Sequence, residues 1–209
     1  MPVSKIKWTK EQSGWALWHI TESEEALAMQ LAPEVCPQDI VSKLKRLEWM
    51  AGRILIRTLV EKAGLTYKGL YKDEFGKPFL IDHLHSISLS HSYPHVAAQI
   101  DRKHPVGIDV EQPKEKLLKI AHRVLSKTEE ADAGNNIQKN CVYWCAKEAL
   151  YKIYGKRGLS FSEHLSVHPF VLNNGGSLIG KICVPGNDEL INLGYSLEDD
   201  FVLVYTKTV

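Results

Sequence analysis

The feature that most constrains this chain is a short alternation of apolar and acidic residues, Gly107-Ile108-Asp109-Val110-Glu111. In an extended strand, side chains two residues apart project from the same face. We therefore expect Asp109 and Glu111 side by side, with Ile108 and Val110 turned into a core. Two neighbouring carboxylates repel each other, and a bound cation is the usual remedy. The segment predicts a strand whose acidic face binds a metal ion.

A third carboxylate is expected from the lysine-rich segment 144–152, which favours a helix. Its acid is Glu148, with Lys147 and Lys152 nearby. Three carboxylates beside lysines indicate Mg²⁺ and a phosphate-bearing substrate, because Mg²⁺ takes hard oxygen ligands and completes its shell with phosphate oxygens. The alternative is an edge strand with two solvated acids and a helix in which Glu148 and Lys152 form an ordinary i, i+4 pair. Spacing alone favours this alternative.

Composition restricts the class of protein. The 209 residues are 44% hydrophobic and 24% charged, which is typical of a globular chain, and the formal net charge of +1 supplies no global field for nucleic acid. The four cysteines lack zinc-ligand spacing and are expected to be reduced thiols in a cytoplasmic protein. No signal-peptide core, membrane-length apolar run, P-loop, dinucleotide fingerprint or G-x-S-x-G elbow occurs. We expect neither a nucleic-acid nor a membrane partner.

Apolar periodicity predicts two halves of similar organisation. For the first half we expect a strand at 14–20, a short helix ending near residue 31, a long helix at 39–63, a polar connector at 67–78 and a hairpin of strands 86–92 and 95–100. For the second half we expect a strand through residue 111, helices at 114–125, 128–133 and 136–154, and strands at 161–167, 177–184, 189–196 and 201–206. The predicted fold class is therefore α+β, a pseudo-dimer of two lobes, 1–103 and 104–209, each a small sheet packed on a long helix.

Further polar residues could bind an anion, although each has a structural interpretation. Ser90 and His91 end a predicted strand, where a hydroxyl and an imidazole can hold phosphate or simply stabilise a turn. Lys77 lies between Gly76 and Pro78 in a turn. Arg46 and Arg53 are seven residues apart on the long predicted helix and could share one face. Basic stripes on helices usually face solvent, so these signals are minor taken singly.

In combination these segments resemble one family. The order "EWMAGRILIR", "FGKPFL", "SLSHS", "GIDVE" and "WCAKEALYK" is similar to that of the 4'-phosphopantetheinyl transferases of the larger, surfactin-synthetase-activating type. The hallmark of that family is G-[IV]-D-[VI]-E followed by [FW]-x-x-K-E-[AS]-x-x-K, and this chain matches every fixed position. The resemblance covers about residues 40 to 155 and implies two similar α+β lobes with coenzyme A in the cleft between them.

The resemblance also implies a reaction. A serine of an apo acyl or peptidyl carrier protein receives phosphopantetheine from coenzyme A, and adenosine 3',5'-bisphosphate leaves, as in a holo-[acyl-carrier-protein] synthase. Mg²⁺ is expected on Asp109, Glu111, Glu148 and the pyrophosphate. Glu148 is expected to act as general base, and Lys152 to assist on the leaving-group side.

Coenzyme A contacts are expected, on the same resemblance, from Lys77, Ser90, His91, Lys147 and Lys152, with Lys77 and His91 near the 3'-phosphate. The family also places a coenzyme-binding arginine in this helix, at a variable distance from the glycine. Here the residue four before Gly52 is Glu48 and not arginine, so Arg53 is the first choice and Arg46 the second. The carrier surface is expected within residues 114–136, and the enzyme is expected to be a monomer. Two alternatives remain: a non-catalytic coenzyme A or carrier-binding module, and an unrelated Mg²⁺-dependent phosphotransferase.

Overall fold

The computed structural model describes residues 3–9, 12–198 and 200–207. The chain divides into two compact units, Met1–Pro105 and Val106–Val209, close to the boundary expected after residue 103. Each unit has its own hydrophobic core. In the part of the chain that is described, no helix combines the length and the apolar character needed to cross a membrane.

The first unit combines an antiparallel sheet of order β1-β2-β6-β5, a small hairpin and two helices. The sheet strands are β1 (Val3–Trp8), β2 (Gly14–His19), β5 (Ser86–Ser92) and β6 (His95–Asp101). The hairpin is formed by β3 (Leu70–Lys72) and β4 (Pro78–Leu80), and the helices are α1 (Glu24–Leu31) and α2 (Lys43–Lys62).

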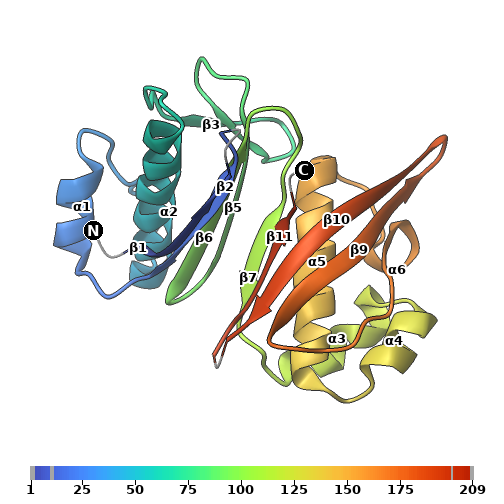
Figure 1. Ribbon diagram of the computed structural model, residues 1–209. Coiled ribbons are helices and arrows are strands. Elements are labelled where there is room, and N and C mark those ends of the chain that lie inside the picture. The colour runs from blue at the N-terminus through green and yellow to red at the C-terminus, as the bar shows by residue number, and fades with distance from the viewer. Residues whose placement is uncertain (1–2, 10–11, 199, 208–209) are drawn as a thin grey trace. The chain divides into compact units, whose positions relative to one another are not determined.

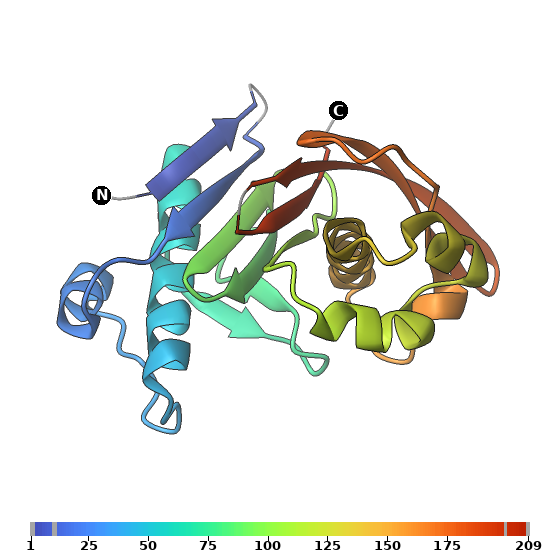
Figure 2. The same cartoon turned by 90° about the horizontal axis from the view of Figure 1, so that it is seen from below.

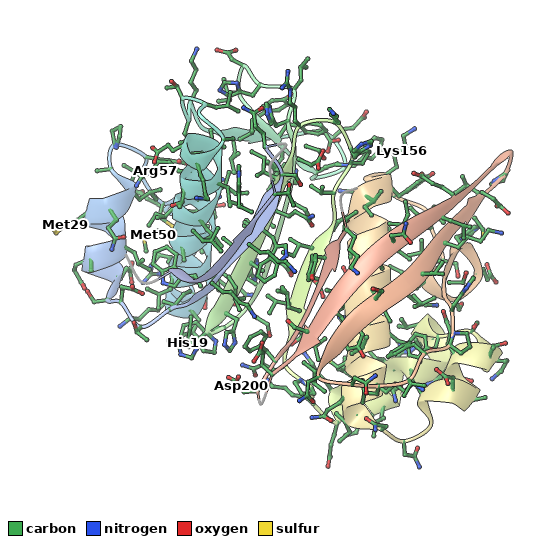
Figure 3. The ribbon with its side chains drawn as sticks, viewed as in Figure 1. His19, Met29, Met50, Arg57, Lys156 and Asp200 are labelled. Atoms are coloured by element: carbon green, nitrogen blue, oxygen red, sulfur yellow. The ribbon has the colours of Figure 1, made fainter. Side chains whose placement is uncertain are left out.

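Helix α2 is the centre of the first unit, with the sheet on one side and α1 on the other (Figures 1 and 2). Apolar residues at three- and four-residue steps give it a continuous buried face. Met50 of α2 is buried, whereas Met29 lies on the outer side of α1 and is exposed (Figure 3). The long amphipathic helix predicted from the sequence is therefore confirmed, although it begins at Lys43 rather than at residue 39.

The second unit is built around helix α5 (Ile137–Tyr154). Figure 2 looks along this helix and shows the sheet curving around one side of it. The five-stranded antiparallel sheet has the order β7-β11-β10-β9-β8. Its strands are β7 (Ile108–Glu111), β8 (Leu165–Val167), β9 (Gly175–Val184), β10 (Asn187–Leu197) and β11 (Val202–Thr206). The shorter helices are α3 (Lys116–Val124), α4 (Lys127–Ala133) and α6 (Phe161–His164).

Most predicted elements are confirmed, and the exceptions are short. Strand β1 was not predicted. The expected polar connector at 67–78 contains β3 and leads into β4. The expected strand 161–167 begins as helix α6 and is extended only from Leu165. Strand β1 has six residues, whereas β3, β4, β8 and α6 have three or four, which is too short for periodicity to separate them from loops.

Candidate functional site

Strand β7 lies directly against helix α5 because of one glycine. A Cβ atom added to Gly107 would lie 2.0 Å from the carbonyl oxygen of Ala149 in α5. Only glycine permits so close an approach of two backbones. The residues that follow Gly107 therefore run along α5, and Asp109 comes within reach of its last turn.

Asp109 is buried and paired with a lysine. Lys152 of α5 donates from Nζ to Oδ1 of Asp109 at 2.7 Å and to the carbonyl oxygen of Ile108 at 2.8 Å. A buried carboxylate without a partner would be costly, so Lys152 stabilises the charge of Asp109. The pair places one anion and one cation of the sequence motifs in direct contact.

Glu148 lies one helical turn before Lys152 and interacts with both acids of β7. The pKa of Glu148 is raised to about 7, mainly by burial and then by the charge of Asp109; Glu111 adds to the shift and Lys152 opposes it. Glu111 is partly buried; its Oε1 accepts from the Gln112 backbone at 2.9 Å. Asp109 and Glu111 are thus close enough for their charges to act on Glu148.

The donor set has the chemistry that Mg²⁺ prefers, because its members are hard carboxylate oxygens. A cation there would also relieve the repulsion that raises the pKa of Glu148. As the side chains stand, no group of three His, Cys, Asp or Glu residues within 3–9, 12–198 and 200–207 is arranged to hold a metal ion. Mg²⁺ would bind here only after the side chains of Asp109, Glu111 and Glu148 adjust. Asp109 is at present bound to Lys152.

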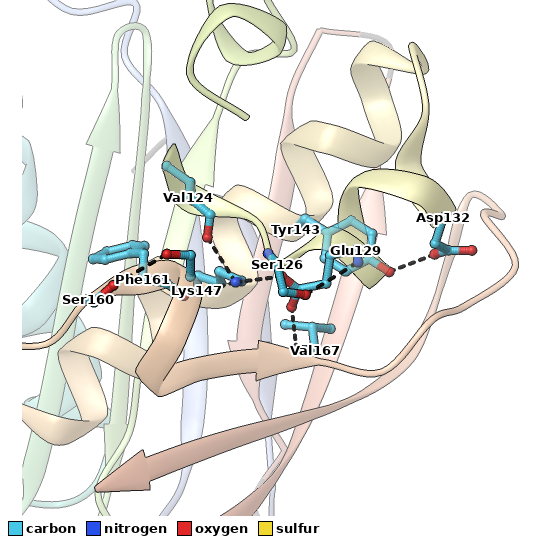
Figure 4. Close-up of polar contacts among 10 residues, drawn as sticks. Val124, Ser126, Glu129, Asp132, Tyr143, Lys147, Ser160, Phe161 and Val167 are labelled. Atoms are coloured by element: carbon cyan, nitrogen blue, oxygen red, sulfur yellow. Dashed lines mark hydrogen bonds and ion pairs between the residues drawn. The ribbon is translucent and has the colours of Figure 1, made fainter. Parts of the chain in front are cut away.

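Lys147 does not have the role expected from the resemblance. Its side chain has no exposure, and its Nζ donates to Oε2 of Glu129 at 2.6 Å and to the carbonyls of Val124 and Phe161, each at 2.9 Å (Figure 4). These three bonds use every N–H of the ammonium group. The structure gives Lys147 no access to coenzyme A, because packing of the neighbouring helices encloses it.

The partner of Lys147 joins several elements of the second unit. Glu129 accepts the backbone N–H of Ser126 through Oε2 and that of Val167 through Oε1, both at 2.7 Å. Nearby, the hydroxyl of Tyr143 donates to Asp132 at 2.6 Å (Figure 4). Lys147 and Glu129 therefore fix α4 to α5 and β8. Sequence reasoning missed Glu129, whose only local signal is its place in a Ser-x-x-Glu capping box.

In the first unit, Ser90 and His91 occupy the end of β5 as predicted. Ser90 is buried, whereas the side chain of His91 is 40% exposed. Nδ1 of His91 lies 3.1 Å from Oε2 of Glu48 on α2. The sequence analysis noted Glu48 only as a missing arginine, and the structure places it in contact with a predicted site residue.

The predicted arginines of α2 are both held by carboxylates of the first unit. Arg46 donates to both carboxylate oxygens of Glu24, at 2.6 and 3.0 Å. Arg53 donates to Glu34 at 2.6 Å and lies 3.6 Å from the centre of the Trp49 ring. Neither guanidinium can turn to a ligand without losing these contacts, so the structure offers no support for either as a coenzyme A contact. Arg57 bonds similarly to the Gln30 carbonyl at the end of α1 (Figure 3).

Lys77 is presented by a turn that its own backbone helps to close. Oδ1 of Asp73 accepts the backbone N–H groups of Phe75, at 3.0 Å, and of Lys77, at 2.8 Å. Gly76 has φ +89°, a conformation that glycine adopts without strain. Burial lowers the pKa of Lys77, and Asp73 opposes this shift. Lys77 therefore lies in the hydrogen-bonded turn between β3 and β4, as the sequence predicted.

Parts of this chain are similar to known proteins. Residues 105–204 match the family model of the 4'-phosphopantetheinyl transferase superfamily. A 4'-phosphopantetheinyl transferase of Bacillus subtilis is 36% identical over 121 residues, covering 53% of each chain. The 4'-phosphopantetheinyl transferase Sfp of Bacillus subtilis strain 168 is 33% identical over 120 residues, again 53% of each chain. The gsp transferase of Aneurinibacillus migulanus is 32% identical over 115 residues, which are 51% of this chain and 48% of that protein. The chain thus spans about half the length of the relatives it matches, and the resemblance to the Sfp type is confirmed.

Proposed function

We propose that this chain, whose residues 105–204 match the family model of the 4'-phosphopantetheinyl transferase superfamily, transfers 4'-phosphopantetheine from coenzyme A to a serine of an apo acyl or peptidyl carrier protein. We further propose that it acts as a monomer in the cytoplasm and uses coenzyme A as the donor of the transferred group. The names of its relatives support the transfer reaction.

The observation that carries the proposal is the interaction of Glu148 with Asp109, Glu111 and Lys152 in the second unit. Transfer of a phosphoryl-type group depends mainly on positioning and on neutralising charge. The carboxylate of Glu148, which lies among these groups, is the group proposed to take the proton of the attacking hydroxyl. The site therefore combines a base with groups that can position a pyrophosphate.

In the proposed reaction, the serine oxygen forms a bond to the β-phosphorus of coenzyme A, and the phosphorus–oxygen bond to the adenosine 3',5'-bisphosphate breaks. The electron pair of the broken bond leaves with the nucleotide. The serine proton passes to the carboxylate of Glu148, directly or through a water molecule. Lys152 donates hydrogen bonds on the leaving-group side, where its charge offsets the charge that develops.

Mg²⁺, held by Asp109, Glu111 and Glu148, would neutralise the pyrophosphate charge. In the first unit, Lys77, Ser90 and His91 are the proposed contacts to coenzyme A. Lys77 and His91 are cationic or can become so, and each is at least partly exposed. They bind and orient the substrate and take no part in the chemical step.

A mass-shift assay tests this function. The protein is mixed with Mg²⁺, coenzyme A and a panel of apo carrier proteins, and we expect at least one carrier to gain the mass of one phosphopantetheine group. Asp109→Asn should abolish the gain. Asp188→Asn is the matched control, because Asp188 is also paired with a lysine in the second unit, at 2.5 Å from Lys181. It should retain full activity.

Two outcomes would contradict the proposed function. Tight binding of coenzyme A without modification of any carrier would favour a non-catalytic binding module. Equal turnover by Asp109→Asn and wild-type protein would exclude the assigned carboxylate site.

A further inference from the structure

Helix α2 and strand β5 meet in a register that decides what His91 contacts. A Cβ atom added to Gly52 would lie 2.9 Å from Cδ2 of Leu89, so the helix passes close to the strand at this point. Glu48 lies one helical turn before Gly52 on the same face. His91 lies two residues after Leu89 and therefore projects from the same face of the strand. The contact between Glu48 and His91 follows from this packing.

Glu48 is a buried carboxylate with three donors around it. Its side chain is 3% exposed. Oε1 accepts the backbone N–H of Tyr93 at 3.0 Å, and Oε2 receives Nζ of Lys45 at 2.7 Å and Nδ1 of His91 at 3.1 Å. These bonds outweigh burial and lower the pKa of Glu48 to about 2, so it is ionised at neutral pH. An ionised carboxylate only accepts hydrogen bonds.

This arrangement fixes the orientation of two cationic side chains. Because Glu48 only accepts, Nδ1 of His91 must carry the hydrogen between them. The other ring nitrogen, Nε2, lies on the far edge of a side chain that is 40% exposed. Lys45, whose side chain is 59% exposed, gives one of its three N–H groups to Glu48. One buried acid thus holds a histidine and a lysine beside each other.

We propose that Glu48 is a positioning residue that holds Lys45 and the doubly protonated ring of His91, which donates from Nε2, as a two-donor subsite for a phosphate monoester of the substrate. The inference rests on the proposed function and adds Lys45 and Glu48 to its binding residues. In this subsite, Lys45 supplies the α2 cation that Arg46 and Arg53 cannot supply, since both are held by other carboxylates. Glu48 itself does not touch the substrate.

The first test examines the ring in the absence of any substrate. ¹⁵N NMR of histidine-labelled wild-type protein, at a pH where His91 is neutral, should show the Nδ1–H form. In Glu48→Gln, we expect the single amide oxygen to accept from the backbone N–H of Tyr93, as Oε1 of Glu48 does, which leaves the amide NH₂ facing Nδ1. The ring should then switch to the Nε2–H form. His91→Ala assigns the signal.

The second test examines binding. Lys45→Ala should raise the KM for coenzyme A about tenfold and leave kcat unchanged, as expected for loss of one hydrogen bond from a charged group. With dephospho-coenzyme A, which lacks the phosphate monoester, the same variant should show no change. Lys43→Ala is the control: Lys43 is exposed on the same helix but about 200° around its axis from Lys45, so its KM should be unaffected.

The two tests fail in different ways. An Nε2–H ring in the wild type would overturn the positioning role of Glu48, whatever the activity. Equal KM values for Lys45→Ala and Lys43→Ala would overturn the subsite. If no carrier is modified, titration of coenzyme A into the labelled protein still reports on His91: a shift seen with coenzyme A and absent with dephospho-coenzyme A supports the subsite even without transfer.

Discussion

At the scale of single residues, identical side chains in one motif have different roles. Lys147 and Lys152 both belong to the lysine-rich helix α5. Lys147 is enclosed by carbonyl groups and Glu129, whereas Lys152 reaches Asp109 at the acidic site. The five-residue step turns the second lysine away from the first by about 140°. Direction from the helix, more than residue type, separates the enclosed lysine from the one at the acidic site.

The raised pKa of Glu148 makes a prediction about stability. Its pKa is about 7 in the folded protein and near 4.5 when unfolded. Between these values the folded state keeps a proton that the unfolded state has lost, so stability falls as the pH rises, and the full cost is present above pH 7. We expect Glu148→Gln to be more stable than wild type by about 1–3 kcal/mol at pH 8 and equal to it below pH 4.5.

Urea unfolding at both pH values, without divalent cations, measures this difference. Glu189→Gln removes an exposed acid from β10 of the same unit and should change stability at neither pH. A Glu148→Gln protein that is less stable than wild type at pH 8 would show that the ionised carboxylate is favourably held, contrary to the repulsion inferred from Asp109 and Glu111.

At the scale of elements, helix α5 connects the acidic site to the rest of the second unit. Its approach to β7 depends on Gly107, and its attachment to α4 depends on Lys147 and Glu129. The same helix therefore positions Glu148 and Lys152 and anchors the segment expected to meet the carrier. Substitutions at either contact should therefore affect the acidic site even though all the proposed metal-binding residues remain.

Gly107→Ala tests the contact of β7 with α5. The new Cβ would collide with the backbone at Ala149, so the strand must move away from the helix. We expect loss of more than 2 kcal/mol of stability and of most transferase activity. Gly180→Ala is the comparison, because its Cβ would meet only the side chain of Leu150, at 2.9 Å, which can turn aside. Equal losses in the two variants would argue against a special role for the β7 contact.

Lys147→Met tests the attachment of α4. Removal of the ammonium leaves Glu129 buried without its cation, and we expect destabilisation of about 3–5 kcal/mol in thermal or urea unfolding. Lys156→Met, at an exposed lysine just after α5 (Figure 3), should have little effect. The double variant Lys147→Met/Glu129→Gln should recover part of the loss. No recovery would mean that the unpaired charge is not the cause.

At the scale of the whole molecule, the proposed site residues are divided between two units with separate cores. Asp109, Glu111, Glu148 and Lys152 belong to the second unit, and Lys77, Ser90 and His91 belong to the first. The proposed chemistry resides in the second unit, and the first contributes contacts to the substrate.

This division predicts that substitutions in the first unit change the KM for coenzyme A, whereas substitutions in the second unit change kcat. His91→Ala should raise the KM for coenzyme A about tenfold with kcat within about twofold of wild type, because it removes a binding contact. Asp109→Asn should lower kcat by more than a hundredfold, and removal of divalent cation by EDTA should have the same effect on wild type. Steady-state assays on one carrier, with Mg²⁺ restored as a control, measure both. A His91→Ala variant that lost only kcat would contradict the assignment.

The sequence predicted the features that depend on local pattern. Periodic apolar residues identified α2 and α5, and alternation identified β5 and β7, whereas the resemblance of the motifs to one family implied that Glu148 meets the acids of β7. It failed for the arginines of α2, because their partners Glu24 and Glu34 lie in other segments. No sequence pattern indicated the proposed roles of Glu48 and Lys45, because these roles depend on contact with a strand some forty residues away.

The amino-acid order alone thus determined the helices, most strands and the family motifs, since these arise from interactions among neighbours in the chain. Tertiary structure decided which charges are enclosed, which are paired and which are presented. The buried Lys147, the occupied arginines and the contact of Glu48 with His91 are examples. The physical reason is that a polar side chain takes its partner from whatever packing brings within hydrogen-bond distance, and that packing joins segments distant in sequence.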